Sequence, residues 1–210
     1  MLGGDILHTK LINAALNQYA LHGYHGATMR NIAEEVEIKP ASIYFFYKNK
    51  EELFIAAFQQ LLDNHFWKME SILNENRNKP VEEIFSTMFQ GIVSHHKGDM
   101  QGTNAYISLV ASPIAEISKY LYDHMARYNK WLVDSLESIL KNSYPKISSS
   151  EMDRVIKQFV FIGNGIFWGI KLYKDEDFEE QVAIANYIIH SLFDELNEKY
   201  LNKIDTGKFN

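Results

Sequence analysis

Apolar residues recur through most of the chain at intervals of three and four positions, which is the spacing of one face of an α-helix. No segment shows the sustained alternation of apolar and polar residues that a half-buried strand requires. Polar breaks divide the pattern into successive segments. The sequence therefore predicts an all-α fold of about nine helices. They are expected over residues 5–21, 28–36, 40–47, 49–73, 80–96, 103–110, 112–140, 148–174 and 177–198.

Capping signals support several of these boundaries. Gly23 is expected to end the first helix, and Ser112 followed by Pro113 to start the longest one. Three pairs of residues have the spacing of a capping box, in which an N-cap side chain is followed three positions later by an acidic one. These pairs are Asn49 with Glu52, Ser148 with Glu151, and Asp177 with Glu180.

Residues 28–50 contain a corner between two short helices. Thr28 is a natural N-cap for the first helix, and Pro40 has the fixed φ that suits the first position of the second. At about 100° per residue, Ile43 and Tyr47 point to one side of the second helix. The opposite side carries small and aromatic residues in place of charges, which is unusual for a solvated helix. This face is suited to a wide polar surface such as a DNA major groove, with Lys48 and Lys50 where a phosphate backbone would pass.

Three consecutive motifs, ATMRNIA, IKPASIY and YKNKEELF, resemble the helix-turn-helix of the TetR family of bacterial transcriptional regulators. The resemblance runs over residues 6–58. In that family one helix braces a second, which enters the major groove, and the following aromatic-Lys-x-Lys segment holds the DNA backbone. The resemblance implies phosphate contacts at Thr28, Arg30, Tyr44, Lys48 and Lys50, and groove contacts at Lys39, Pro40, Ala41, Ser42 and Phe45.

Two positions depart from the family pattern. Glu37 stands where the family usually has a turn glycine, which costs on the order of 1 kcal/mol if the turn needs a positive φ. Phe46 stands where the family often has histidine, which removes one possible phosphate contact. The alternative interpretation of this region is an ordinary pair of packed helices in an α-helical protein.

Composition narrows the possible functions. The chain has 210 residues and no cysteine, which excludes disulfides, thiolate zinc sites and cysteine nucleophiles. The net charge is −6, but residues 1–62 carry five lysines or arginines against six acidic residues. The acidity therefore lies mainly in the remainder of the chain. Since phosphate neutralisation supplies most DNA affinity, we expect modest, salt-sensitive binding unless two copies act together.

No enzyme motif is found. The eight histidines do not have the spacing of a metal site, and no nucleophile elbow, P-loop or dinucleotide-binding glycine pattern occurs. We therefore expect no catalytic residue, no metal and no cofactor. The N-terminus lacks the pattern of a signal peptide, and no uninterrupted apolar stretch approaches the roughly 20 residues of a membrane span. The expected location is the cytoplasm, without a membrane partner.

The remainder of the chain is predicted to bind a ligand and to dimerise. The predicted division is a DNA-binding domain over residues 1–50, continuing into the linking helix 49–73, and a helical domain over residues 51–210. The last two helices are apolar on several faces, so they need more partners than one chain supplies, unless they are simply central in a monomer. The expected homodimer interface comprises Ile162, Gly165, Ile166, Gly169, Ile188 and Leu192.

Aromatic residues are dense in this second domain, and they either fill a core or line an apolar cavity. The predicted lining, with a few polar anchors, comprises Phe66, Phe85, Met88, Phe89, His95, Tyr106, Tyr128, Trp131, Phe161, Asn164 and Trp168. The expected effector is a hydrophobic small molecule, neutral or cationic because the domain is acidic. Its binding would act on the DNA-reading helices through residues 49–73.

The family resemblance implies a homodimeric, ligand-responsive repressor that binds a near-palindromic operator in double-stranded DNA. Two other functions stay open on the sequence. One is an all-α enzyme or small-molecule-binding protein that does not bind DNA. The other is a helical scaffold that docks a protein partner through Tyr44 and Phe45.

Overall fold

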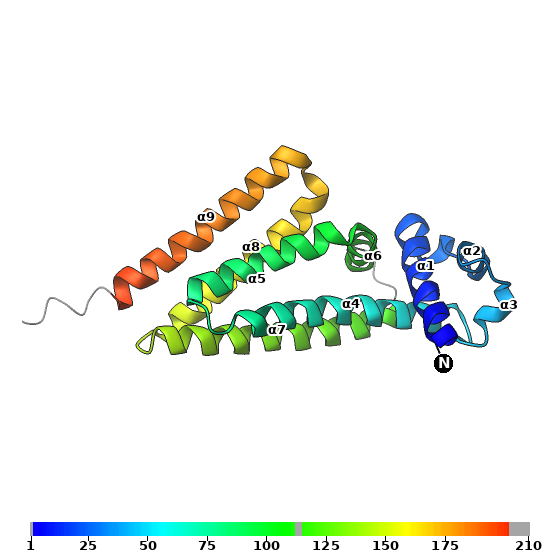
Figure 1. Cartoon of the computed structure of the whole chain (residues 1–210), viewed down its shortest axis with the longest axis horizontal. Coiled ribbons are helices and arrows are strands. Elements are labelled where there is room, and N and C mark those ends of the chain that lie inside the picture. Colours follow the sequence, from blue (N-terminus) through cyan, green and yellow to red (C-terminus); the bar gives the residue numbers. More distant parts are fainter. Residues whose placement is uncertain (1, 112–114, 202–210) are drawn as a thin grey trace, which may run out of the picture. The chain divides into compact units, whose positions relative to one another are not determined.

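The computed structural model describes residues 2–111 and 115–201, which form nine α-helices and contain no strand (Figure 1). The predicted all-α class is confirmed. The helices are α1 (Leu2–Gly26), α2 (Met29–Glu35), α3 (Pro40–Ile43), α4 (Lys50–Asn76), α5 (Val81–Gly98), α6 (Met100–Ala111), α7 (Ala115–Ser143), α8 (Ser149–Leu172) and α9 (Asp175–Tyr200).

The predicted order of helices is confirmed, and most boundaries agree to within a few residues. Gly23 interrupts α1 with a φ of 63°, so the predicted stop is present, although another turn follows as far as Gly26. The predicted start of α7 at Ser112 and Pro113 lies outside the described residues. With 29 residues, α7 is the longest helix in the described part of the chain.

The predicted cap of the last helix is wrong. Helix α9 begins two residues before Asp177, and its N-cap is Lys174, which makes no side-chain capping bond. Asp175, Glu176 and Asp177 all lie in the first turn. Negative charges there interact favourably with the helix dipole, so this end is stabilised by charge instead of by a capping box.

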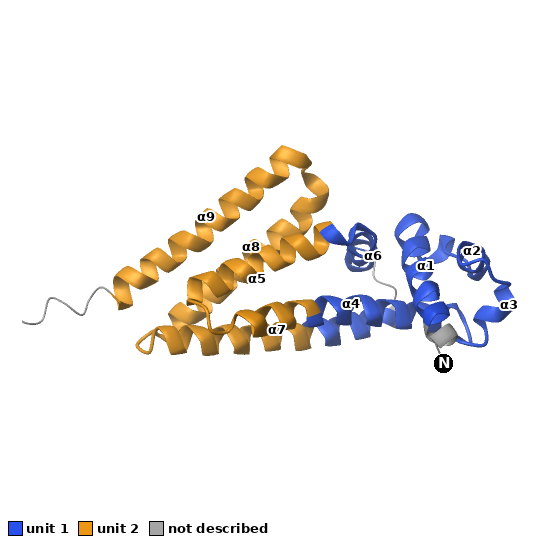
Figure 2. Cartoon of the chain, in the orientation of Figure 1, with its two compact units in different colours: residues 1–67, 98–125 blue, residues 68–97, 126–210 orange. Residues whose placement is uncertain are grey.

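The chain divides into two compact units (Figure 2). Unit 1 comprises residues 1–67 and 98–125, and unit 2 comprises residues 68–97 and 126–210. The division falls inside α4 and α7, and residues 98–125 belong to the same compact unit as the predicted DNA-binding helices. This structural division differs from the predicted functional division between residues 50 and 51. The functional division concerns binding roles and stays a prediction.

Unit 1 is built on an apolar core shared by α1, α2, α3, α4, α6 and the N-terminal part of α7. Leu11, Ile32, Ile43 and Phe54 are fully buried in it. Helix α6 is also tied to α1 by the side-chain amide of Gln101, which donates to the backbone carbonyl of Asn13 at 2.9 Å. The core therefore fixes the short helices α2 and α3 against a larger support.

Unit 2 has a second core, in which aromatic rings from three helices meet. The ring of Phe85 in α5 lies 4.9 Å from those of both Phe159 in α8 and Phe193 in α9, centre to centre and nearly edge-on. Aromatic pairs prefer this arrangement. It holds α8 and α9 to α5.

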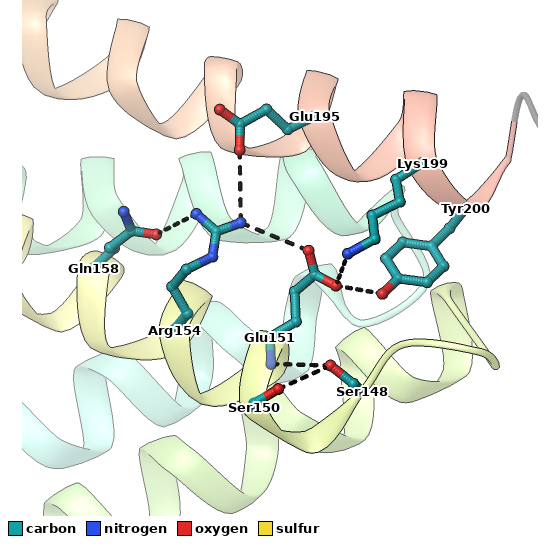
Figure 3. A network of polar contacts seen from close by, with 8 residues as sticks. All are labelled: Ser148, Ser150, Glu151, Arg154, Gln158, Glu195, Lys199 and Tyr200. Carbon is teal, nitrogen blue, oxygen red and sulfur yellow. Dashed lines mark hydrogen bonds and ion pairs between the residues drawn. The ribbon is translucent and has the colours of Figure 1, made fainter.

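Polar contacts join the start of α8 to the end of α9 (Figure 3). Ser148 caps α8 by accepting from the backbone N–H of Glu151 at 3.3 Å. The Glu151 carboxylate does not close the capping box, because it accepts from Lys199 Nζ at 2.7 Å and from the hydroxyl of Tyr200. Arg154 lies 3.7 Å from Glu151 and 3.5 Å from Glu195. The two helix ends are thus held by charge as well as by the core.

Helix α8 is the one helix in the described residues that is long and apolar enough to cross a membrane, judged by length and composition alone. Val155, Phe159 and Ile166 of this helix are buried in unit 2. The core helix of a protein that does not span a membrane meets the same criterion, and the burial of these three residues is typical of such a helix.

Candidate nucleic-acid interface

The corner between α2 and α3 closes as a tight turn. The N–H of Glu37 donates to Glu34 O at 3.1 Å, and the N–H of Ile38 donates to Ala33 O at 2.9 Å. Glu37 has a φ of 58°, so the turn has the left-handed residue for which glycine is usually selected. Glu37, in place of the glycine usual in the family, therefore keeps the turn geometry at the cost of backbone strain.

Helix α2 begins as the sequence predicts. The hydroxyl of Thr28 accepts from the N–H of Asn31 at 3.1 Å, which makes Thr28 the N-cap. Thr28 and Arg30 are both exposed, on the side where the resemblance implies phosphate contacts. Ile32 and Ala33 of the same helix are fully buried. The amphipathic pattern therefore sets which face of α2 reaches solvent.

Helix α3 starts at Pro40, and two buried residues anchor the segment that follows it. Ile43 is fully buried and Tyr47 is 5% exposed, as the predicted facing requires. The hydroxyl of Tyr47 is 2.7 Å from Nε2 of His8 in α1. Burial and the nearby charge of Glu52 raise the pKa of Tyr47 to about 12, so its hydroxyl keeps its proton.

The opposite face of this segment is open to solvent and largely aromatic. Phe45 is 88% exposed, Tyr44 54% and Phe46 38%. The predicted groove residues Lys39, Pro40 and Ala41 are also exposed, and Ser42 is partly exposed. The structure thus brings the predicted groove residues together on one continuous segment.

The segment after Tyr47 carries the two lysines expected to hold phosphates. Asn49 Oδ1 accepts from the N–H of Glu52 at 2.8 Å, and the Glu52 carboxylate accepts from the N–H of Lys48 at 2.8 Å. The predicted cap of α4 is therefore present, although the carboxylate reaches one residue beyond the N-cap. The side chain of Lys48 is exposed and suited to a phosphate contact.

Lys50 is placed differently. Its ammonium donates to the backbone carbonyl of Tyr24 and lies 4.3 Å from the centre of the Tyr24 ring. Burial lowers the pKa of Lys50. The charge of Lys50 is thus engaged at the end of α1 in this structure, and its phosphate contact stays a prediction.

Sequence reasoning missed two members of this site, His8 and Tyr24. Both lie in α1 and support residues 39–50, which we call the reading segment. His8 contacts Tyr47, and Tyr24 contacts Lys50. A side chain that contacts a residue far along the chain leaves no periodic signal in the sequence, so no pattern pointed to them.

The predicted pocket residues lie in both units, so no single compact unit encloses them. Phe66 and Tyr106 belong to unit 1, and the other nine to unit 2. Phe85, Met88 and Phe89 are at most 1% exposed, as core residues are. Tyr128 is also buried, whereas His95 and Trp131 are partly exposed.

Three of the predicted pocket residues require correction. Phe161 is 78% exposed, Trp168 is 40% exposed, and Asn164 is also exposed. They occupy the side of α8 that faces away from buried Phe159 and Ile166. They therefore form an outer surface of unit 2 and do not line its interior.

The predicted dimer residues divide into two groups. Ile166 is 5% exposed and Leu192 6%, and Gly169 is also buried, next to the ring of Phe178. Because these three pack inside one chain, their assignment to an interface is corrected. Gly165 and Ile188 are exposed and Ile162 is partly exposed, so they stay candidates.

Comparison with known proteins identifies the reading segment. Residues 11–57 match the family described as bacterial regulatory proteins, tetR family. The biofilm operon icaADBC HTH-type negative transcriptional regulator IcaR of Staphylococcus epidermidis is 28% identical over 127 residues. This match covers 60% of the present chain and 65% of the relative, slightly less than two thirds of that protein's length.

Two solved structures share the fold. FadR from Bacillus subtilis, in complex with stearoyl-CoA, has a TM-score of 0.68 at 19% identity and covers 88% of this chain and 96% of its own. The fatty acid degradation regulator FadR from Bacillus halodurans has a TM-score of 0.65 at 20% identity, over 86% and 96%. At these identities the likeness extends to the arrangement of helices.

Proposed function

Because this chain belongs to the TetR family of bacterial regulatory proteins, we propose that it is a sequence-specific DNA-binding transcriptional regulator. The observation that carries the proposal is the helix-turn-helix of α2 and α3, with Ile43 and Tyr47 anchored in the core and Tyr44 and Phe45 turned to solvent. A scaffold or an enzyme would not need this corner together with the exposed Lys48 beside it.

The proposed regulator acts as a homodimer. One face of α8 and α9 carries large apolar side chains that a lone chain leaves in water, among them Phe161 and Leu172 at 78% and 73% exposed. Tyr187 is 73% exposed and Ile184 53%. Apolar residues at this density mark an interaction surface, and a second copy covers it with the same residues. Two reading segments then meet two half-sites of a near-palindromic operator.

The proposed direction of control is repression. The relative from S. epidermidis is named a negative transcriptional regulator. A dimer bound over a promoter lowers transcription by occupying the DNA. We assign the chain no catalytic residue and no cofactor, and we propose that it acts in the cytoplasm, where its DNA lies.

The proposed effector is a hydrophobic small molecule. FadR of B. subtilis was solved with stearoyl-CoA, a ligand with a long apolar chain. Within unit 1 of the present chain the rings of Phe66 and Tyr106 are only partly buried, so they keep surface for a ligand. The acidic excess beyond residue 62 favours neutral or cationic compounds over anions. By linkage, an effector that weakens DNA binding is itself bound more weakly by the DNA complex.

The decisive experiment selects bound duplexes from a random library with the full-length protein. We expect enrichment of an inverted repeat whose half-sites are centred about 34 Å apart, with retention in a gel that falls as salt rises. A binder without sequence preference would enrich no motif and shift all duplexes alike at every salt concentration, and that result would refute the proposal.

The effector is tested on the selected duplex. Neutral and cationic hydrophobic compounds, with stearoyl-CoA as an anionic comparison, are screened for a rise in melting temperature. Each stabilising compound is then titrated into the protein–DNA complex, where release of the duplex is expected. A compound that binds tightly and releases no DNA would contradict the coupling and leave the DNA-binding proposal intact.

A further inference from the structure

Phe45 has the largest exposed fraction, 88%, of any large hydrophobic side chain in the described residues. A ring in water at this position contributes almost nothing to the stability of the fold. The residues two positions away on either side, Ile43 and Tyr47, are buried at 0% and 5%. The sequence therefore places its most exposed apolar ring between two anchors.

The backbone that carries Phe45 is held by local hydrogen bonds. The N–H of Phe45 donates to Ser42 O at 3.3 Å, and the N–H of Phe46 donates to Ile43 O at 2.9 Å. The contact between Tyr47 and His8 fixes the end of the segment. A ring presented on a fixed backbone loses little conformational freedom on binding, so its contact adds directly to affinity and selectivity.

The chemistry of this surface limits what it can recognise. The exposed side chains of Pro40, Ala41 and Phe45 carry no hydrogen-bonding group, so they cannot read the donors and acceptors of base edges. In the major groove the apolar group offered by the bases is the C5-methyl of thymine, and Phe and Ala are among the side chains that contact it. An apolar reading surface therefore matches thymine.

We propose that Phe45 is a specificity-determining residue that contacts the C5-methyl group of a thymine in each operator half-site. The inference rests on the proposed function and adds the chemical feature that is read. It means that each half-site has thymine at the position facing Phe45. Cytosine there lacks the methyl group and binds less tightly.

The test removes the methyl group and nothing else. In the selected duplex, each thymine is replaced in turn by deoxyuridine, which keeps every hydrogen-bonding group of the base. At the position facing Phe45, the replacement is expected to weaken binding by about fourfold per half-site, the factor for burial of one methyl group at 25 °C. Replacements at other thymines are expected to leave affinity unchanged.

Protein variants assign the effect to the ring. Phe45→Ala is expected to bind the thymine duplex more weakly than the unmodified protein does. The variant should bind the thymine duplex and the deoxyuridine duplex with the same affinity. Phe45→Leu keeps an apolar side chain and is expected to retain part of the methyl dependence. The matched control is Tyr122→Ala, which removes another exposed aromatic ring, 68% exposed in α7. This control should keep the full dependence.

Three results would overturn the inference. In the first, every deoxyuridine duplex binds as tightly as the thymine duplex. In the second, Phe45→Ala keeps the methyl dependence. In the third, 2-aminopurine fluorescence shows that Phe45 separates stacked bases and acts as a wedge. Failure of the proposed function is distinct, since the unmodified protein would then select no duplex at all.

Discussion

The ammonium of Lys50, at the start of α4, donates to the backbone carbonyl of Tyr24 near the end of α1 and lies 4.3 Å from the centre of that residue's ring. Carbonyl groups at a helix end lack partners within the helix, so a cation there satisfies one of them. Lys48, two residues earlier, is exposed. Two lysines in one motif therefore have different environments, and we infer that Lys48 is the one that contacts DNA.

Salt dependence separates these tasks. Lys48→Ala is expected to weaken binding to all duplexes and to lower the slope of log affinity against log salt by about one unit, because one phosphate contact is lost. Lys50→Met keeps the aliphatic stem, should leave the slope unchanged, and should lower the free energy of unfolding by about 1–2 kcal/mol. Gel-shift titrations at several salt concentrations and urea unfolding measure the two effects. An equal decrease of the slope in both variants would mean that Lys50 also contacts a DNA phosphate.

The strained turn at Glu37 gives a second prediction. With a φ of 58°, Glu37 occupies a region in which a side chain costs energy and glycine does not. Glu37→Gly is expected to raise the free energy of unfolding by about 1 kcal/mol, after allowance for the greater freedom of glycine in the unfolded chain. Glu34→Gly, inside α2, is the control and should lower it by about 1 kcal/mol. If both glycines destabilised the protein, the turn would not be strained.

The Glu151 network gives a prediction about pH. Burial alone would raise the pKa of Glu151, but hydrogen bonds from Lys199 and Tyr200 and the nearby charges of Lys199 and Arg154 lower it below the ordinary value of 4.5. A carboxyl group whose pKa is lower in the folded state stabilises the fold above its unfolded pKa. It loses that contribution as pH falls through its folded pKa.

Glu151→Gln is therefore expected to lower the free energy of unfolding by about 1–2 kcal/mol at neutral pH, with a deficit that shrinks as the pH falls below 4.5. Urea unfolding across this range measures it. Asp153→Asn is the control, because the ion pair of Asp153 with Lys157 is exposed at 55% and 75%. Exposed pairs of this kind contribute only about 0.5 kcal/mol. A deficit in Glu151→Gln that did not depend on pH would mean that its charge is not involved.

The exposed apolar face of α8 and α9 gives a prediction about assembly. Leu172→Asp places a charge on that face and is expected to convert the dimer to a monomer and to weaken binding to the palindromic duplex. Leu21→Asp is matched in size and exposure, 65% against 73%, and lies in unit 1, so it should stay dimeric. Light scattering at micromolar concentration distinguishes the two. If the Leu172→Asp variant is still a dimer, the interface does not lie on this face.

Interactions within three or four residues were determined by the sequence itself. The cap that Thr28 makes with the N–H of Asn31, and the one that Asn49 makes with Glu52, span three residues each, so the order of residues suffices to predict them. The buried side of Ile43 and Tyr47 follows from the same helical geometry. The all-α class and the two-helix corner were predictable for this reason.

Tertiary structure alone decided which chemically equivalent side chains became core and which became surface. Helix α8 is apolar on several faces, so its sequence has no single direction that marks the interior, and packing buried Ile166 while leaving Phe161 in water. Lys50 meets Tyr24 across 26 positions, and Tyr47 meets His8 across 39. Such contacts depend on how helices are brought together in space, and helical periodicity constrains only neighbours on the same helix.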